Sequence, residues 1–184
     1  TDAEPAIRLV VVSGTGRVVV AGYDLGSIAE RATGAPEERT AGSAFESVAN
    51  RLDDLTIPTS CRLNGGVYGG ATDLALACDF RIGVQGMQLR MPAARLGLHY
   101  YASGLQRFVS RLGLAAAKRL FLLAENLAAD ELLRSGYLDT LVPPERLDAE
   151  VDTLAAALAA NAPLALRGMK QSLNEIARGG FDQA

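Results

Sequence analysis

The chain has 184 residues, of which 49% are hydrophobic and 21% are charged, and its formal net charge is −3. This balance is typical of a globular chain and excludes intrinsic disorder. A chain of this length buries enough surface to fold without a metal or a disulfide. Because it has no basic excess to pair with phosphates, its composition argues against a nucleic-acid partner.

The cysteine and histidine content argues against a structural metal site. The chain has two cysteines, Cys61 and Cys78, without metal-ligand spacing, and one histidine, His99. We expect two small buried thiols in a reducing, cytoplasmic environment. No apolar run is long enough to span a membrane, and the first residues do not resemble a signal peptide, so we expect no membrane association.

The first half of the chain alternates short apolar runs with glycine-rich loops. We expect strands at 7–13, 18–21, 58–63 and 80–84, and a small apolar helix at 71–77. The polar stretch 27–42 is either a loop or the start of a helix. After it, the three- and four-residue spacing of four apolar residues predicts one face of a helix: Phe45, Val48, Leu52 and Leu55. This alternation predicts parallel βα units.

The second half of the chain is predicted to be mainly helical. Apolar residues at 105, 108, 109 and 112 predict one helix face, and further helices are expected at 114–123 and 128–135, the last ending at Gly136. A short strand at 138–142 is closed by Pro143 and Pro144. The helices at 147–161 and 164–177 complete the pattern.

The most informative segment is NGGVYGGATDLALACD, residues 64–79. Here Gly69 and Gly70 open a helix directly after a strand and a loop. The N–H groups at a helix start are unpaired and carry the positive end of the helix dipole. The segment therefore suits an anion, either a phosphate or a negative charge that develops on oxygen. It is neither a Walker loop nor a dinucleotide-binding loop, because the Lys-Ser/Thr pair and the G-x-G-x-x-G spacing are both missing.

Two segments together resemble the crotonase (enoyl-CoA hydratase/isomerase) superfamily: RLVVVSGTGRVVVAGYDL and IPTSCRLNGGVYGGATDLALACDFRIG. The resemblance runs from about residue 7 to 177. It implies an α/β fold, a spiral of βα units over 1–142 followed by a helical region over 143–184. It also implies a homotrimer or a dimer of trimers. The family has a strand and helix before this region and helices after it, so we expect such segments to be missing from both ends.

The resemblance also implies an acyl-CoA substrate bound at an oxyanion hole, with no other cofactor and no metal. The two donors would be the backbone N–H groups of Tyr23 and Gly70, which stabilise the thioester oxygen as an enolate forms. The rest of the first loop would help to bind the thioester: Ala21, Gly22, Asp24 and Leu25. The same Asp24 also fits a residue that fixes its own turn.

The chain departs from the family pattern at both acid–base positions. Hydratases of the family use two glutamates; the first position is occupied here by Asp73 and the second by Ala93. Alanine cannot move a proton, and residues 89–96 contain no acid, so the two-carboxylate hydration mechanism is incomplete. Asp73 is a candidate catalytic group, although an acid in the first turn of a helix is also favoured by the dipole.

A nearby tyrosine suggests a second reaction. Methylmalonyl-CoA decarboxylases of the family lack the second glutamate and carry a tyrosine at the position of Tyr100, which makes Tyr100 a candidate catalytic residue. They tend to have histidine where this chain has Tyr23. The predicted enzyme could therefore hydrate, isomerise, decarboxylate or hydrolyse an acyl-CoA. The alternative is an acyl-CoA binder without activity. We expect His99 to be a packing or surface residue, and charged residues such as Lys170 to be solvated rather than bound to CoA phosphates.

Overall fold

The computed structural model describes residues 7–16, 18–20 and 40–180. Four parallel strands form the first sheet, in the order β1-β3-β5-β8. Their bounds are Val10–Ser13 (β1), Thr59–Leu63 (β3), Phe80–Val84 (β5) and Thr140–Val142 (β8). Since β-branched and apolar residues dominate these runs and the sheet is covered on both faces, the predicted parallel βα arrangement is confirmed.

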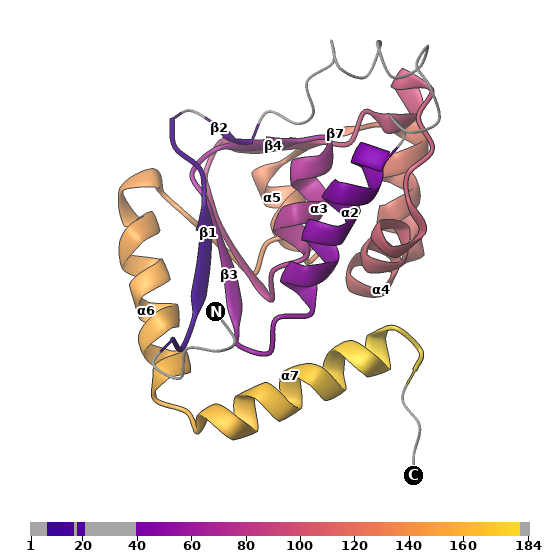
Figure 1. The fold of residues 1–184 in the computed structure, drawn as a ribbon. Helices are drawn as coiled ribbons and strands as arrows, with labels where there is room; N and C mark the ends of the chain where they lie inside the picture. The colour runs from indigo at the N-terminus through magenta and orange to yellow at the C-terminus, as the bar shows by residue number, and fades with distance from the viewer. Residues whose placement is uncertain (1–6, 17, 21–39, 181–184) are drawn as a thin grey trace.

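A second sheet of four short strands runs across one end of the first (Figure 1). Its order is β2-β4-β6-β7, with parallel pairs except for the antiparallel pair β6 and β7. Its strands are Val18–Val20 (β2), Gly66–Tyr68 (β4), Gln88–Arg90 (β6) and Asn126–Ala128 (β7). This sheet positions the glycine-rich segment, because β4 leads directly into Gly69 and Gly70.

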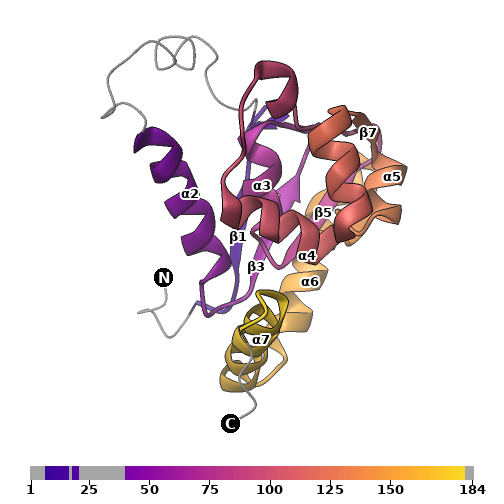
Figure 2. The same cartoon turned by 90° about the vertical axis from the view of Figure 1, so that its right-hand side faces the viewer.

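Helices cover both faces of the first sheet. In Figure 1, α6 lies on one side of β1 and β3, and α2 and α3 lie on the other, with α4 beyond α3. The longer helices are Thr40–Asp53 (α2), Gly70–Leu76 (α3), Ala102–Lys118 (α4), Ala129–Arg134 (α5), Leu147–Ala159 (α6) and Pro163–Ala177 (α7). Three single-turn helices are Ala93–Leu96 (η2), Arg119–Leu123 (η3) and Pro144–Arg146 (η4). Helix α7 runs below one end of the first sheet in Figure 1 and is seen nearly end-on in Figure 2.

The core lies between the first sheet and the helices α3 and α4. Its largest fully buried side chains include Tyr137, Phe108 and Leu76. The chain breaks within α4 at Gly113, whose φ of 82° is left-handed and favours glycine. The predicted helices at 114–123 and 128–135 therefore correspond to the end of α4 with η3, and to α5.

One residue of the predicted helix face is exposed. Val48 was expected to lie on the packed face of α2, but it is 56% exposed. Two other members of that face do pack inward, since Leu52 contacts the hydrophobic core and the Phe45 ring packs against Gly70. Buried Asp53 on the same helix pairs with arginines of α4. No helix in the described ranges is both long enough and apolar enough to cross a membrane.

Candidate active site

The turn at Gly69 and Gly70 begins α3 and leaves the Gly70 amide without an acceptor in the part of the chain that the structure describes. Gly69 has a φ of 56°, and its N–H donates to the carbonyl of Arg90 at 2.9 Å, which ties the turn to β6. The carbonyl of Gly69 accepts from the N–H of Thr72 at 3.0 Å. The N–H of Gly70 has no intrahelical partner because Gly70 is the first helical residue, and it has no acceptor among the described residues. This amide can therefore donate to a ligand.

The predicted partner of this amide cannot be compared with it. Tyr23, together with Ala21, Gly22, Asp24 and Leu25, lies outside the described residues. The second donor of the expected oxyanion hole and the predicted thioester-binding loop therefore stay predictions.

Asp73 lies one turn after Gly70 on α3, and its side chain is fully buried. One carboxylate oxygen, Oδ1, accepts from Nη1 of Arg107 at 2.6 Å. The other, Oδ2, accepts from the hydroxyl of Tyr101. Both oxygens are thus engaged by groups of the chain itself, which is the arrangement of a buried, compensated carboxylate.

Tyr100 and Tyr101 form an aromatic wall beside Asp73. Their rings stack with centroids 4.4 Å apart at an interplanar angle of 27°, and the hydroxyl of Tyr100 lies 3.5 Å from that of Tyr101. Burial, and then the charge of Asp73, raise the pKa of both phenols, so both remain protonated at neutral pH. The structure therefore brings the predicted residues Asp73 and Tyr100 together.

Gly104 on α4 allows this convergence. A Cβ atom at this position would lie 2.5 Å from Tyr100, 2.8 Å from Tyr101 and 3.0 Å from Oδ2 of Asp73. On the other side of the cluster, the Phe45 ring packs against Gly70, where a Cβ atom would lie 3.0 Å from Cζ of Phe45. Phe45 and Tyr101 meet edge to face with centroids 6.3 Å apart. One contiguous cluster therefore joins the free amide of Gly70 to the tyrosines.

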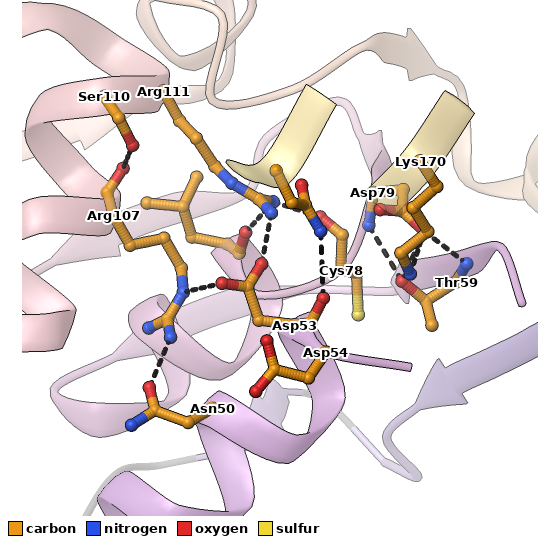
Figure 3. A network of polar contacts seen from close by, with 12 residues as sticks. Asn50, Asp53, Asp54, Thr59, Cys78, Asp79, Arg107, Ser110, Arg111 and Lys170 are labelled. Atoms are coloured by element: carbon orange, nitrogen blue, oxygen red, sulfur yellow. Dashed lines mark hydrogen bonds and ion pairs between the residues drawn. The ribbon is translucent and has the colours of Figure 1, made fainter. Parts of the chain in front are cut away.

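Behind this cluster lies a network of ion pairs centred on Asp53 (Figure 3). Asp53 contacts Nε of Arg107 at 3.4 Å and Nη2 of Arg178 at 2.8 Å, and it also pairs with Arg111. A polar cavity of about 210 Å³ lies among these groups, between α2, α4 and the end of α7. Arg107 contacts both Asp53 and Asp73, so it links the candidate site to this network.

Other residues considered from the sequence have structural roles. Lys170 was expected to be solvated, but its side chain is only 9% exposed, and its Nζ lies 2.7 Å from Asp79 and 3.0 Å from the carbonyl of Ile57 (Figure 3). Cys61 and Cys78 are buried and free, as predicted, and their mutual hydrogen bond and burial raise the pKa of Cys61. His99 is exposed, as expected for a surface residue.

The structure also places Ala93, which occupies the position of the second glutamate of the hydratases. Ala93 is buried at the start of η2, and its carbonyl accepts from the N–H of Leu98 at 2.9 Å. Its methyl group provides no acid at the position where hydratases of the family were expected to carry one. The described residues contain no cluster of three metal-ligating side chains.

Comparison with known proteins gives the family. The sequence profile of the enoyl-CoA hydratase/isomerase family matches residues 1–180. This chain belongs to that family. Crotonyl-CoA hydratase of Syntrophomonas wolfei is 31% identical over 182 residues, 98% of this chain and 69% of the relative. Short-chain-enoyl-CoA hydratase of Clostridium acetobutylicum is 32% identical and covers the whole chain and 70% of the relative. The predicted family and the assignment as an enzyme are thus confirmed.

Solved structures of the family confirm the fold. The crystal structure of an enoyl-CoA hydratase from Bacillus anthracis is 31% identical and superposes with a TM-score of 0.85, covering 94% of this chain and 66% of that chain. The predicted crotonase-type fold with a helical C-terminal region is therefore correct.

Sequence reasoning missed Tyr101 and Arg107 as partners of Asp73. They lie 28 and 34 residues further along the chain, so no local spacing indicates the contacts. One usable signal is that Arg107 and Arg111, four residues apart, interrupt the apolar face of α4 beside Phe108. Charged residues on an inward face need partners, so the pair predicts buried carboxylates nearby.

Proposed function

We propose that this chain converts an acyl-CoA thioester, holding the thioester oxygen with the backbone N–H of Gly70 and stabilising an enolate there. The N–H of Tyr23 is the second donor in this proposal. The observation that carries it is the Gly70 amide at the start of α3, which has no acceptor among the described residues, in a chain of the enoyl-CoA hydratase/isomerase family. The names of the two hydratase relatives support a CoA thioester as substrate.

The physical basis is electrostatic. The thioester oxygen gains negative charge as the enolate forms, and a fixed N–H donor at a helix start stabilises that charge without reorganising. Removing one such donor typically lowers kcat by about 10²–10³-fold. The Phe45 ring, which meets the Tyr101 ring edge to face, supplies an apolar boundary beside Gly70, where a hydrogen bond to the developing charge is stronger than in water.

Two reaction classes remain within this proposal. Hydration is favoured by the names of the two relatives, and isomerisation by the description of the family. Decarboxylation of a β-carboxyacyl-CoA is favoured by Ala93 and by the engagement of both Asp73 oxygens, because breaking the bond to the carboxylate requires no base to remove an α-proton. In that case Tyr100 lines the site. We propose that the enzyme needs no cofactor beyond the CoA thioester itself.

We also infer a cytoplasmic enzyme that forms a homotrimer or a dimer of trimers. Exposed apolar side chains on α7 support self-association: Leu164, Met169, Leu173 and Ile176. Sedimentation of the purified chain tests the assembly, and a single monomeric species would contradict it.

The proposed function is tested by a turnover screen with crotonyl-, malonyl- and methylmalonyl-CoA, using Gly70→Pro and Gly70→Ala. Proline removes the N–H but suits the first position of a helix, while alanine places the same Cβ against Phe45 and keeps the donor. We expect Gly70→Pro to lose about 10²–10³-fold in kcat relative to Gly70→Ala. Equal activities of the two folded variants would refute the role of this amide.

A further inference from the structure

Asp73, Tyr101 and Arg107 form a continuous set of contacts between the free Gly70 amide and the ion pairs around Asp53. Building on the proposed function, we propose that Asp73 is a positioning residue and that the group it presents to the acyl thioester is the hydroxyl of Tyr101. This assigns a role to Tyr101 that neither the sequence pattern nor the family match indicates.

The surroundings of Asp73 leave it no open side. Its side chain is fully buried, Oδ1 is held by Arg107 at 2.6 Å, and Oδ2 accepts the hydroxyl of Tyr101. The backbone of Gly104 covers Oδ2, since a Cβ atom there would lie only 3.0 Å away. A substrate proton could reach Asp73 only after one of these contacts was broken. Asp73 is therefore arranged to hold other groups.

The position of Tyr101 suits contact with the acyl group. Gly70 and Asp73 lie three residues apart on α3 and so share one face of the helix. The Phe45 ring packs against Gly70 and meets the Tyr101 ring edge to face. The Tyr101 ring therefore lies, with Phe45, beside the helix face that carries Gly70 and Asp73, and the Gly70 amide there has no acceptor among the described residues.

The hydrogen bond to Asp73 also fixes the polarity of the Tyr101 hydroxyl. Its proton points to the carboxylate, so the oxygen presents its lone pairs elsewhere and acts as an acceptor. The 3.5 Å contact from the hydroxyl of Tyr100 is long for an O–H···O bond and leaves this capacity largely unused. The partner that Tyr101 takes is therefore a hydrogen-bond donor, either a hydroxyl on the acyl group or a bound water.

The kinetic test compares Asp73→Asn, Tyr101→Phe and the double variant, using the thioester that the enzyme turns over. If Asp73 acts through Tyr101, each single variant lowers kcat by at least about tenfold. The double variant then has the same kcat as the less active of the two single variants, because the residues act as a unit. The shape of the pH–kcat profile is then the same in Asp73→Asn as in the wild type. The matched control is Asp148→Asn, an exposed carboxylate paired with Arg62 away from the site, and it leaves kcat unchanged.

Two kinetic outcomes would overturn the inference. One is full activity of Tyr101→Phe beside a loss of about 10²-fold or more in Asp73→Asn, which is the signature of a direct proton-transfer group. The other is multiplicative losses in the double variant. Absence of turnover with every thioester would refute the proposed function instead, and a second readout separates the two failures.

That readout is the absorbance of tyrosinate at about pH 11, which is clean because the chain has five tyrosines and no tryptophan. Removing the charge of Asp73 favours ionisation of the phenol it contacts, so Asp73→Asn shows more tyrosinate than the wild type, and adding Tyr101→Phe removes the excess. Circular dichroism verifies that each variant stays folded. Equal tyrosinate in Asp73→Asn and the wild type would overturn the inference even for a protein without measured turnover.

Discussion

Replacing Arg107 by methionine should destabilise the fold far more than its single charge suggests. The Arg107 side chain is 4% exposed and donates to Asp73 at 2.6 Å and to Asn50 at 2.8 Å. Methionine fills most of its volume but leaves Asp73 with the Tyr101 hydroxyl alone, inside a site without solvent contact. Breaking a buried pair from one side costs about 3–5 kcal/mol, a large fraction of the ordinary 5–15 kcal/mol of unfolding free energy.

Urea unfolding followed by circular dichroism measures this loss. Adding Asp73→Asn to Arg107→Met should recover part of it, because the uncompensated carboxylate is removed. The matched control is Arg119→Met, since Arg119 also pairs with two carboxylates, Glu125 at 2.6 Å and Glu131 at 3.2 Å. Because Arg119 is 49% exposed, this substitution should leave the unfolding free energy without a measurable change. A loss below about 1 kcal/mol for Arg107→Met, or a double variant no more stable than the single, would refute the reasoning.

Two further predictions concern Tyr100 and Gly104 in the same cluster, and a third concerns Gly168 on α7. Burial, followed by the charge of Asp73, raises the pKa of Tyr100 in the folded chain. Above about pH 10 the unfolded chain therefore loses this proton while the folded chain keeps it. The unfolding free energy then falls by up to about 1.4 kcal/mol for each further pH unit. Tyr100→Phe should make urea unfolding less sensitive to pH in that window, and an unchanged slope would contradict the assignment. Gly104→Ala should destabilise the fold by about 1–3 kcal/mol because its Cβ overlaps Tyr100 and Tyr101. Gly168→Ala, where a Cβ meets nothing within 4 Å, should stabilise α7 by up to about 1 kcal/mol, and equal effects of the two alanines in thermal unfolding would show that the overlap is relieved.

The sequence predicted the strands of the first sheet well, but it missed most of the three-residue strands of the second sheet. The strands expected at 58–63 and 80–84 match β3 and β5 to within one residue, because each lies between clear turn signals and is rich in apolar residues. The strands β4, β6 and β7 have three residues each and were missed, since three residues carry no periodicity. The strands β2 and β8 are equally short but were predicted, because a glycine or a proline pair marks where each apolar run ends. On α2, Val48 was wrongly expected to be packed, and the pairing of buried Asp53 with arginines of α4 was not indicated by the spacing of the sequence.

The candidate site divides in the same way. Gly70 and Asp73 could be located from sequence because they belong to one local motif, a glycine turn followed by the first turn of a helix. What Asp73 contacts could not, because Tyr101 and Arg107 reach it from α4 through tertiary packing. An aspartate with both oxygens engaged and an aspartate open to solvent look the same in a sequence.

Helix α7 turns its polar face toward the body of the protein and its apolar face outward, the opposite of an ordinary surface helix. Three polar side chains at four-residue spacing attach it to the body: Lys170 to Asp79, Asn174 to the Asp53 carbonyl, and Arg178 to Asp53 and Asp54. Its apolar side chains face outward instead. Charge pairs weaken as salt screens them, whereas sulfate and similar salts strengthen apolar burial. The buried Lys170–Asp79 pair is screened little, whereas Arg178 is 41% exposed. In sulfate, the core should therefore tighten while the end of α7 near Arg178 loosens.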